Sequence, residues 1–130
     1  MKIRLASHLD QKPIANLYQN QGLDLGDWEG IYPYWLVAEH EDRVVGALQI
    51  MHGRPAGRLE FLGLDPTLSH RRRAEAVYRL GHAGFEALRE NGSTLASTSV
   101  RFEDKPFKKI LRKHFGMKVT GQANLLLARL

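Results

Sequence analysis

Hydrophobic and polar residues alternate at the start of the chain, and a helical spacing follows. The alternation predicts a strand over residues 2–6. Apolar residues then recur at i, i+3 and i+4, the spacing of one helix face, beyond the capping candidates Ser7 and Asp10. Gly22 has the conformational freedom to end this helix. The chain therefore opens with a strand and a helix.

Alternation and β-branched residues predict further strands in the middle and at the end of the chain. The segment between the first helix and these strands, residues 23–33, is punctuated by glycine and proline and is expected to be irregular. The first two strands are joined by a turn at residues 41–43, which is typical of a β-hairpin. The predicted strands cover residues 34–39, 44–52, 58–64 and 93–100, with two more within residues 117–130 around Gly121 and Gln122.

Two more helices are predicted between these strands. A long helix ends at Asn91 and Gly92, and its buried face is expected to contain Val77, Leu80, Gly81, Gly84 and Leu88. Asp104 caps a last helix that ends at Gly116. The buried face of this last helix is expected to contain Phe107, Ile110, Leu111 and Phe115. The resulting order, β-α-β-β-β-α-β-α-β-β, predicts an α/β (α+β) fold with helices on the faces of a sheet.

Length and composition fit one globular domain over residues 1–130. The chain has 130 residues, of which 43% are hydrophobic and 25% charged. The absence of cysteine excludes disulfides, thiolate metal sites and cysteine nucleophiles.

No apolar run approaches the roughly 20 residues that a bilayer requires, so no membrane partner is expected. No apolar leader segment is visible in residues 1–6, and a cytoplasmic location is predicted. The six histidines lack ligand spacing, so no metal is expected.

Charge is distributed unevenly along the chain. The net charge is +5, because 19 Lys and Arg residues face 14 Asp and Glu residues. Residues 1–53 carry four basic and seven acidic residues, or −3, whereas residues 54–130 carry fifteen and seven, or +8. This split suits a polyanion in one place and a cation in another, or it is simply a solvated surface. The basic side of the last helix lies opposite its Phe residues, so nucleic acid is an unlikely partner.

Four stretches of the sequence resemble the GNAT superfamily of N-acetyltransferases, and together they cover essentially the whole chain. They are residues 3–6 with 14–17, the hairpin Val37-Ala38-Glu39 with Val44-Val45-Gly46, residues 62–66 with the long helix, and Phe115-Gly116-Met117. The resemblance implies a mixed, mostly antiparallel sheet of about six to seven strands, with helices on both faces. Its fourth and fifth strands would splay apart around acetyl-coenzyme A.

The resemblance also implies a coenzyme A site. The backbone of Leu62 and Leu64 would contact the pantetheine arm. The pyrophosphate would lie at the start of the long helix, where free N–H groups and the helix dipole favour an anion. The family pattern there is Gln/Arg-x-x-Gly-x-Gly/Ala, and this chain has Arg71-Arg72-Arg73-Ala74-Glu75-Ala76, with Ala74 in place of the middle glycine. Guanidinium groups of the three arginines suit phosphate oxygens.

The usual catalytic markers of the family are replaced. Arg112 stands where many members have a tyrosine acid, and Lys105 stands where they often have asparagine. Solvent, Ser97 or Ser99 could supply the proton instead. Direct attack by an amine in a ternary complex still needs a base that deprotonates it. Glu60 is a candidate base and Glu39 an alternative, unless each is a solvent-facing strand residue.

The acceptor site of the family is usually shaped by the segment after the first helix. That segment contains acidic and aromatic residues that suit a cationic amine, or that anchor a loop: Asp27, Trp28, Glu29 and Tyr32. The predicted function is therefore acetyl-coenzyme A-dependent N-acetylation of a small-molecule or protein amine, and a homodimer is left open. The alternative is a non-catalytic binding or structural protein with the GNAT fold, encoded by a bacterium or phage.

Overall fold

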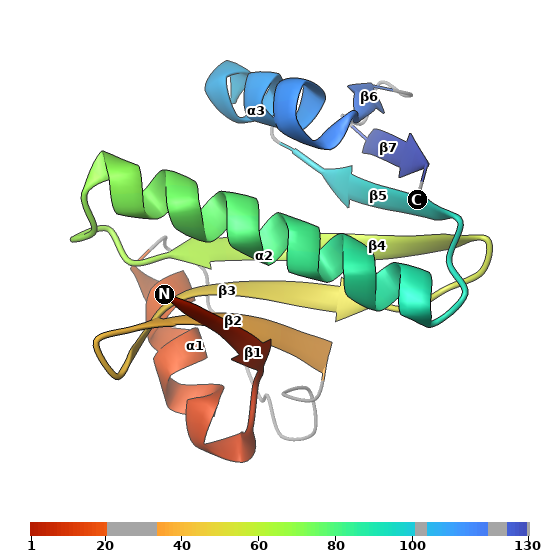
Figure 1. Cartoon of the computed structure of the whole chain (residues 1–130). Helices are drawn as coiled ribbons and strands as arrows, with labels where there is room; N and C mark the ends of the chain where they lie inside the picture. The colour runs from red at the N-terminus through yellow and green to blue at the C-terminus, as the bar shows by residue number, and fades with distance from the viewer. Residues whose placement is uncertain (21–33, 101–103, 120–124, 130) are drawn as a thin grey trace. The chain divides into compact units, whose positions relative to one another are not determined.

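The computed structural model describes residues 1–20, 34–100, 104–119 and 125–129 (Figure 1). Its strands are β1 (Lys2–Leu5), β2 (Trp35–His40), β3 (Arg43–Met51), β4 (Ala56–Leu64), β5 (Leu95–Ser99), β6 (Lys118–Val119) and β7 (Leu125–Arg129). Its helices are the 3-10 turn η1 (His8–Asp10), α1 (Gln11–Gln19), α2 (His70–Glu90) and α3 (Lys105–Phe115). This is the predicted order of elements. The predictions for Gly22, residues 23–33 and residues 121–122 lie outside the described residues.

Hydrogen bonds connect the seven strands in the order β1-β2-β3-β4-β5-β7-β6. The pairs β1–β2, β2–β3, β5–β7 and β6–β7 are antiparallel, whereas β4–β5 is parallel. The predicted mixed and mostly antiparallel sheet is therefore confirmed. The chain divides into two compact units, Met1–Gln49 with Phe61–Ala83, and Ile50–Glu60 with Gly84–Leu130. A single domain over residues 1–130 stays a prediction.

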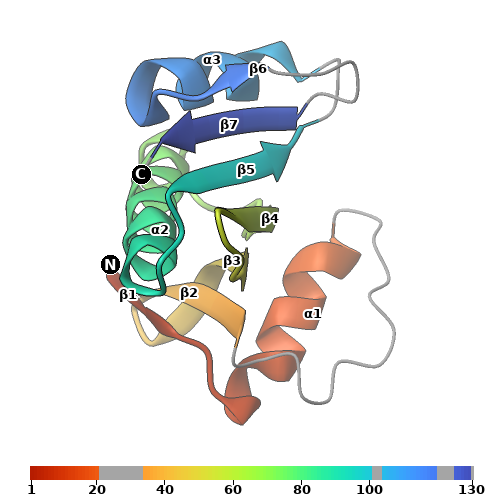
Figure 2. The same ribbon diagram turned by 90° about the vertical axis from the view of Figure 1, so that its right-hand side faces the viewer.

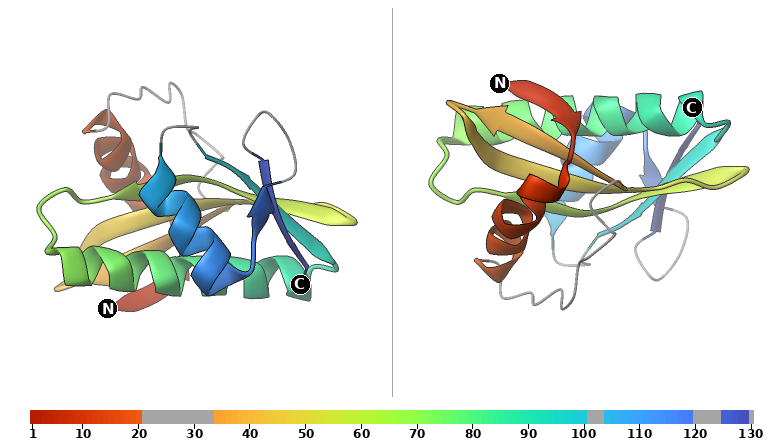
Figure 3. Two further views of the ribbon diagram at one scale, coloured as in Figure 1. Left: turned by 90° about the horizontal axis from the view of Figure 1, so that it is seen from above. Right: turned by 90° about the horizontal axis from the view of Figure 1, so that it is seen from below.

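In the first unit, helices α1 and α2 cover opposite faces of the strands (Figure 3). On one face, Tyr18 of α1 packs edge-on against Trp35 of β2, with ring centroids 5.4 Å apart. On the other face, Leu80 of α2 lies over Gly46 of β3, where an added Cβ would come within 3.1 Å of the Leu80 Cδ1 atom. Gly46 thus lets the helix approach the sheet closely.

In the second unit, the end of α2 and helix α3 share an apolar core. The rings of Phe85 and Phe115 meet edge-on, with their centroids 5.7 Å apart. Leu111, one turn before Phe115 on α3, is also buried. Asp104 caps α3 by accepting a hydrogen bond from the Phe107 N–H, and Gly116 ends it with φ 62°. Both predicted caps are confirmed.

Two sequence expectations about local structure were wrong in detail. Ile110 keeps 37% of its surface exposed, because the buried stripe of α3 runs through Leu111 and Phe115 instead. The hairpin turn contains only Glu41 and Asp42, at φ 51° and 58°, so Arg43 already begins β3. Two successive left-handed residues are the geometry of a type I′ turn, which matches the twist of the flanking strands.

Two glycines of β4 each lie against a side chain of a helix. In the second unit, a Cβ on Gly57 would come within 2.4 Å of the Leu88 Cδ2 atom of α2. In the first unit, a Cβ on Gly63 would come within 3.1 Å of the Tyr18 Cζ atom of α1. Each glycine therefore leaves space that a larger side chain would fill.

Candidate functional site

The parallel pairing of β4 with β5 ends early. It joins Ala56 with Leu95, Gly57 with Ala96 and Arg58 with Ser97. Strand β4 then continues to Leu64 and β5 to Ser99 with no further pair in the described part of the chain. Figure 2 shows β5 beside its antiparallel partner β7. The backbone groups of β4 beyond Arg58 are therefore not used by a β5 ladder.

Three side chains form a polar cluster where this pairing ends: Arg58 and Glu60 of β4, and Ser99 of β5. The Arg58 Nη2 and Nε atoms donate to Glu60 Oε1 at 2.6 and 3.1 Å. The Ser99 hydroxyl donates to the same oxygen at 3.4 Å and accepts from Arg58 Nη2 at 3.4 Å. The Glu60 side chain is 11% exposed and that of Arg58 is 48% exposed. Glu60 Oε1 thus accepts three hydrogen bonds from the other two side chains of the cluster.

The residues that precede the cluster in β4 and β5 are tightly packed. Gly57 lies so close to Leu88 that an added Cβ would come within 2.4 Å of its Cδ2 atom. The buried Ser97 donates its hydroxyl to the Gly57 carbonyl at 3.3 Å. Of the two serines considered as proton donors, Ser97 is therefore engaged inside the sheet, whereas Ser99 is exposed at the ion pair.

A second polar group organises the loop between β4 and α2. The Asp65 carboxylate accepts from the backbone N–H and the hydroxyl of Thr67, at 2.8 and 2.7 Å. It also accepts from Arg43 Nη1 at 2.9 Å. These donors, with the Thr67 hydroxyl contributing most, lower the pKa of Asp65. Because the Asp65 N–H also donates to the Val45 carbonyl at 2.8 Å, the loop is anchored to β3.

The first turn of α2 places three arginines together. The helix begins at His70, and Ser69 caps it by accepting from the Arg72 N–H at 3.2 Å. The backbone N–H groups of the first helical residues have no acceptor within a helix, which leaves those of His70 and Arg71 available. Arg72 pairs with Glu75 at 2.9 Å and Arg73 contacts His70 at 3.1 Å, while Arg71 is exposed.

The structure places the residues of the expected phosphate-binding motif within helix α2. Residues 65–69 form the loop, so Arg71–Ala76 occupy the first two turns of the helix rather than the loop itself. Ala74 is exposed and Ala76 is buried, and the cofactor contacts of both stay predictions.

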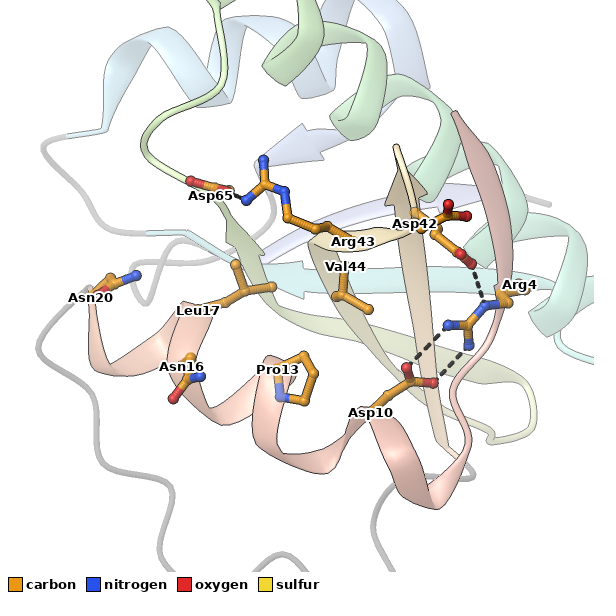
Figure 4. Close-up of a pocket in the computed structure, with 11 residues that line it drawn as sticks. Arg4, Asp10, Pro13, Asn16, Leu17, Asn20, Asp42, Arg43, Val44 and Asp65 are labelled. Carbon is orange, nitrogen blue, oxygen red and sulfur yellow. Dashed lines mark hydrogen bonds and ion pairs between the residues drawn. The ribbon is translucent and has the colours of Figure 1, made fainter.

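Glu39, the other candidate base, is bonded to Arg4. Figure 4 shows Arg4 beside Asp10. The Arg4 Nε donates to Glu39 Oε2 at 2.8 Å, and its two terminal nitrogens donate to Asp10 at 2.7 and 3.0 Å. The Asp10 carboxylate also accepts from the Ser7 N–H at 2.7 Å. The hydrogen bond from Arg4 is the main cause that lowers the pKa of Asp10, and the same bond raises the pKa of Arg4.

A pocket of about 440 Å³ adjoins this Arg4 network in the first unit. Helix α1 forms one wall with Pro13, Asn16, Leu17 and Asn20, and the hairpin of β2 and β3 forms the other. Arg43 and Asp65 close one end of the pocket, while Arg4, Asp10 and Glu39 lie at the other. Both guanidinium groups face carboxylates of the pocket, so the wall supplies its own counter-charges.

Other predicted residues lie in varied surroundings. Leu62 and Leu64 are half-buried in β4 beyond its last β5 pair, and Lys105 and Arg112 are exposed on α3. Asp27, Trp28, Glu29 and Tyr32 lie outside the described residues, so their acceptor role stays a prediction. No cluster of three or more metal-binding side chains occurs among the residues whose placement is described. None of the helices there is long and apolar enough to cross a bilayer.

Sequence reasoning missed two residues that organise the polar groups. Arg58 is two residues before Glu60, and residues at this spacing on a strand share a face, so their opposite charges were a usable signal. Asp65 is followed by Pro66 and Thr67, a pattern in which an aspartate accepts hydrogen bonds from its own loop. The partner Arg43, 22 positions away in sequence, had no such signal.

The sequence matches no protein-family model and no curated protein. Its structure is similar to N-acetylglutamate synthase from Neisseria gonorrhoeae, complexed with coenzyme A and N-acetyl-glutamate, with a TM-score of 0.79 and 17% identity over 99% of this chain. The chain spans only 35% of the length of that synthase.

Two smaller proteins match along nearly their whole length. Ribosomal-protein-alanine N-acetyltransferase from Brucella melitensis gives a TM-score of 0.77 at 17% identity, with full coverage of both chains. The PaiA N-acetyltransferase from Thermoplasma acidophilum, in complex with coenzyme A, gives 0.76 at 14% identity, over 99% of this chain and 98% of that protein. At these identities the similarity establishes the fold, and the GNAT fold expected from the sequence is confirmed.

Proposed function

We propose that this chain is an acetyl-coenzyme A-dependent N-acetyltransferase that acts on a primary amine by direct attack in a ternary complex. The observation that carries this proposal is the early end of the β4–β5 ladder after Arg58 and Ser97. It leaves the β4 backbone around Leu62 and Leu64 available to a ligand that hydrogen-bonds like a strand. The similar N-acetyltransferases solved with coenzyme A support this assignment.

The start of α2 fits the phosphates of coenzyme A. Its first free N–H groups, on His70 and Arg71, and the dipole of a 21-residue helix favour an anion. Arg71 adds an exposed guanidinium, whereas Arg72 already pairs with Glu75. Asp65 and Ser69 hold the loop and the helix start in place. We assign Arg71 the main side-chain contact with phosphate.

Glu60 is the better placed of the two candidate bases. Acetyl-coenzyme A, when bound, supplies an activated acyl carbon that a neutral amine attacks with release of the thiol. Glu60 lies at the point where β4 and β5 cease to pair, and its Oε2 atom has no hydrogen-bond partner in the described part of the molecule. That oxygen can accept a proton from the ammonium group of the acceptor. Glu39 is instead engaged by Arg4.

The test is calorimetric titration of the purified chain with coenzyme A and with acetyl-coenzyme A. We expect micromolar binding that weakens about three- to tenfold in Arg71→Ala, because one charge-assisted contact is lost. Arg89→Ala is the matched control: it removes the same charge from an exposed position in the last turn of the same helix, where the guanidinium contacts only its neighbour Glu86.

Two outcomes would contradict the proposal in different ways. Absence of binding at millimolar ligand would overturn the coenzyme A site itself. Binding without release of free thiol across a panel of amines would overturn the enzyme and leave the non-catalytic protein with the same fold. Equal weakening in Arg71→Ala and Arg89→Ala would contradict the specific role of Arg71.

A further inference from the structure

We propose that the ion pair of Arg58 and Glu60 selects an acceptor that carries both an ammonium and a carboxylate group, as an α-amino acid does. This inference rests on the proposed function and names the substrate class of the same site. It adds one observation to those that support Glu60 as the base. In each of the two side chains, some polar atoms make hydrogen bonds and one makes none within the described residues.

The contacts of the pair leave one atom of each charge open. Glu60 Oε1 receives Arg58 Nη2 at 2.6 Å, Arg58 Nε at 3.1 Å and the Ser99 hydroxyl at 3.4 Å. Within the described part of the chain, Glu60 Oε2 and Arg58 Nη1 make no hydrogen bond or ion pair. An acceptor oxygen and a donor nitrogen of opposite charge are thus open on neighbouring side chains.

The charge balance of the pair decides between classes of acceptor. A simple amine would satisfy Glu60 Oε2 but would leave Arg58 Nη1 without an anion. An anionic ligand without an ammonium group would contact Arg58 but would be repelled by Glu60. A zwitterion satisfies both atoms and keeps the cluster neutral, which is the arrangement with the smallest uncompensated charge.

The location of the pair fits contact with a substrate rather than support of the fold alone. The Arg58 side chain is 48% exposed, and exposed ion pairs contribute little to stability. The guanidinium is nevertheless held by three hydrogen bonds, to Glu60 and Ser99, so its remaining nitrogen has a fixed direction. A planar, preorganised donor of this kind is suited to a carboxylate.

The experiment compares each L-amino acid with its own carboxamide as acceptor, which removes the negative charge. Because the carboxamide also lowers the pKa of the α-ammonium group, each acceptor is measured with both the wild type and the variant. In the wild-type chain we expect the amino acid to have the higher kcat/KM for at least one pair. Arg58→Gln should raise KM for that amino acid about 10- to 100-fold more than it raises KM for the amide, and any change in kcat through the lost contact with Glu60 should be the same for both acceptors. Arg58→Lys should restore part of the difference, and Arg89→Gln is the charge-matched control.

Binding measurements keep this test independent of catalysis. Titration of the coenzyme A-loaded chain with the free amino acids and their carboxamides should show the same dependence on Arg58, because coenzyme A carries no acetyl group to transfer. Arg58-dependent binding of carboxylates without turnover would support the inference while overturning the proposed enzyme. Equal loss for the acid and the amide in Arg58→Gln, a preference for the amide in the wild type, or no binding of any acid would overturn the inference, with the thermal unfolding midpoint showing that the variant is folded.

Discussion

Two arginine–glutamate pairs in this molecule differ in how many nitrogens of the arginine make hydrogen bonds. In the first unit, Arg4 bonds Glu39 and Asp10, so one guanidinium serves two carboxylates. In the second unit, Arg58 bonds Glu60, so one guanidinium serves one carboxylate and a hydroxyl. The first arrangement uses all three nitrogens of its arginine, whereas the second leaves one unused. Saturation of the hydrogen-bonding atoms therefore separates a structural ion pair from a candidate site.

The burial of the carboxylates supports this distinction. Asp10 is 5% exposed and joins β1, the turn at Ser7 and the start of α1 through its hydrogen bonds. These elements belong to one compact unit, and the bonds fix their junction. Within the described residues, Glu60 bonds to Arg58, the last β4 residue that pairs with β5, and to Ser99, which lies beyond that pairing and pairs with β7. Removal of Asp10 should therefore affect folding, and removal of Glu60 should affect chemistry.

The largest expected effect concerns the two glutamates. Glu60→Gln should lower kcat/KM for acetyl transfer about 100- to 1,000-fold, because the amide cannot accept the proton of the ammonium group. Glu39→Gln should stay within about twofold of the wild type, since Arg4 holds it in a structural network. Initial rates of free thiol release measure both. A large loss in Glu39→Gln with normal rates in Glu60→Gln would reverse the assignment.

The next effect concerns stability at the Arg4 network. Asp10→Ala should lower the free energy of unfolding by about 2–3 kcal/mol, less than for a fully buried pair because Arg4 is partly exposed. Glu39→Ala should cost about 1 kcal/mol or less, because Arg4 retains Asp10. Urea unfolding at neutral pH measures both values. Similar losses in the two variants would show that the network does not depend on its buried carboxylate.

The smallest effect is the dependence of stability on acid. The pKa of Asp10 is lowered in the folded chain, mainly by the hydrogen bond from Arg4. Its contribution is complete above the unfolded value, near pH 4, and is lost as the pH falls through the lower folded value. Asp10→Asn should therefore flatten the decline of stability below about pH 4. Asp65, whose pKa is also lowered, keeps part of that decline in the variant. An unchanged slope in urea midpoints across this range would contradict the assignment.

Local signals in the sequence predicted the elements well. The periodicity of Ile14 and Leu17, the Asp104 cap and the glycine at position 116 each act within a few residues, and the structure confirms the elements they predict. Alternation likewise predicted the strands to within one or two residues at most ends. The order of elements was then enough to suggest the fold, because few sheet topologies accommodate it.

The candidate site was less predictable because its contacts are not local. Glu60 was identified, but its hydroxyl partner Ser99 is 39 positions away, and the bond between Glu39 and Arg4 spans 35. A single sequence does not show which acidic residue pairs with an arginine whose three nitrogens all make hydrogen bonds. No residue was predicted for the start of α2, and the structure begins the helix at His70, where Ser69 accepts a hydrogen bond from the Arg72 N–H.

The close contacts of the two β4 glycines have an evolutionary consequence. Gly57 packs against Leu88 of α2 and Gly63 against Tyr18 of α1, so each position has a neighbour that leaves little room for a side chain. Loss or gain of one residue in a strand exchanges the two sides for every residue beyond it. In a lineage of related chains, length variation should therefore gather in the loops and avoid this strand, even where its other side chains diverge freely.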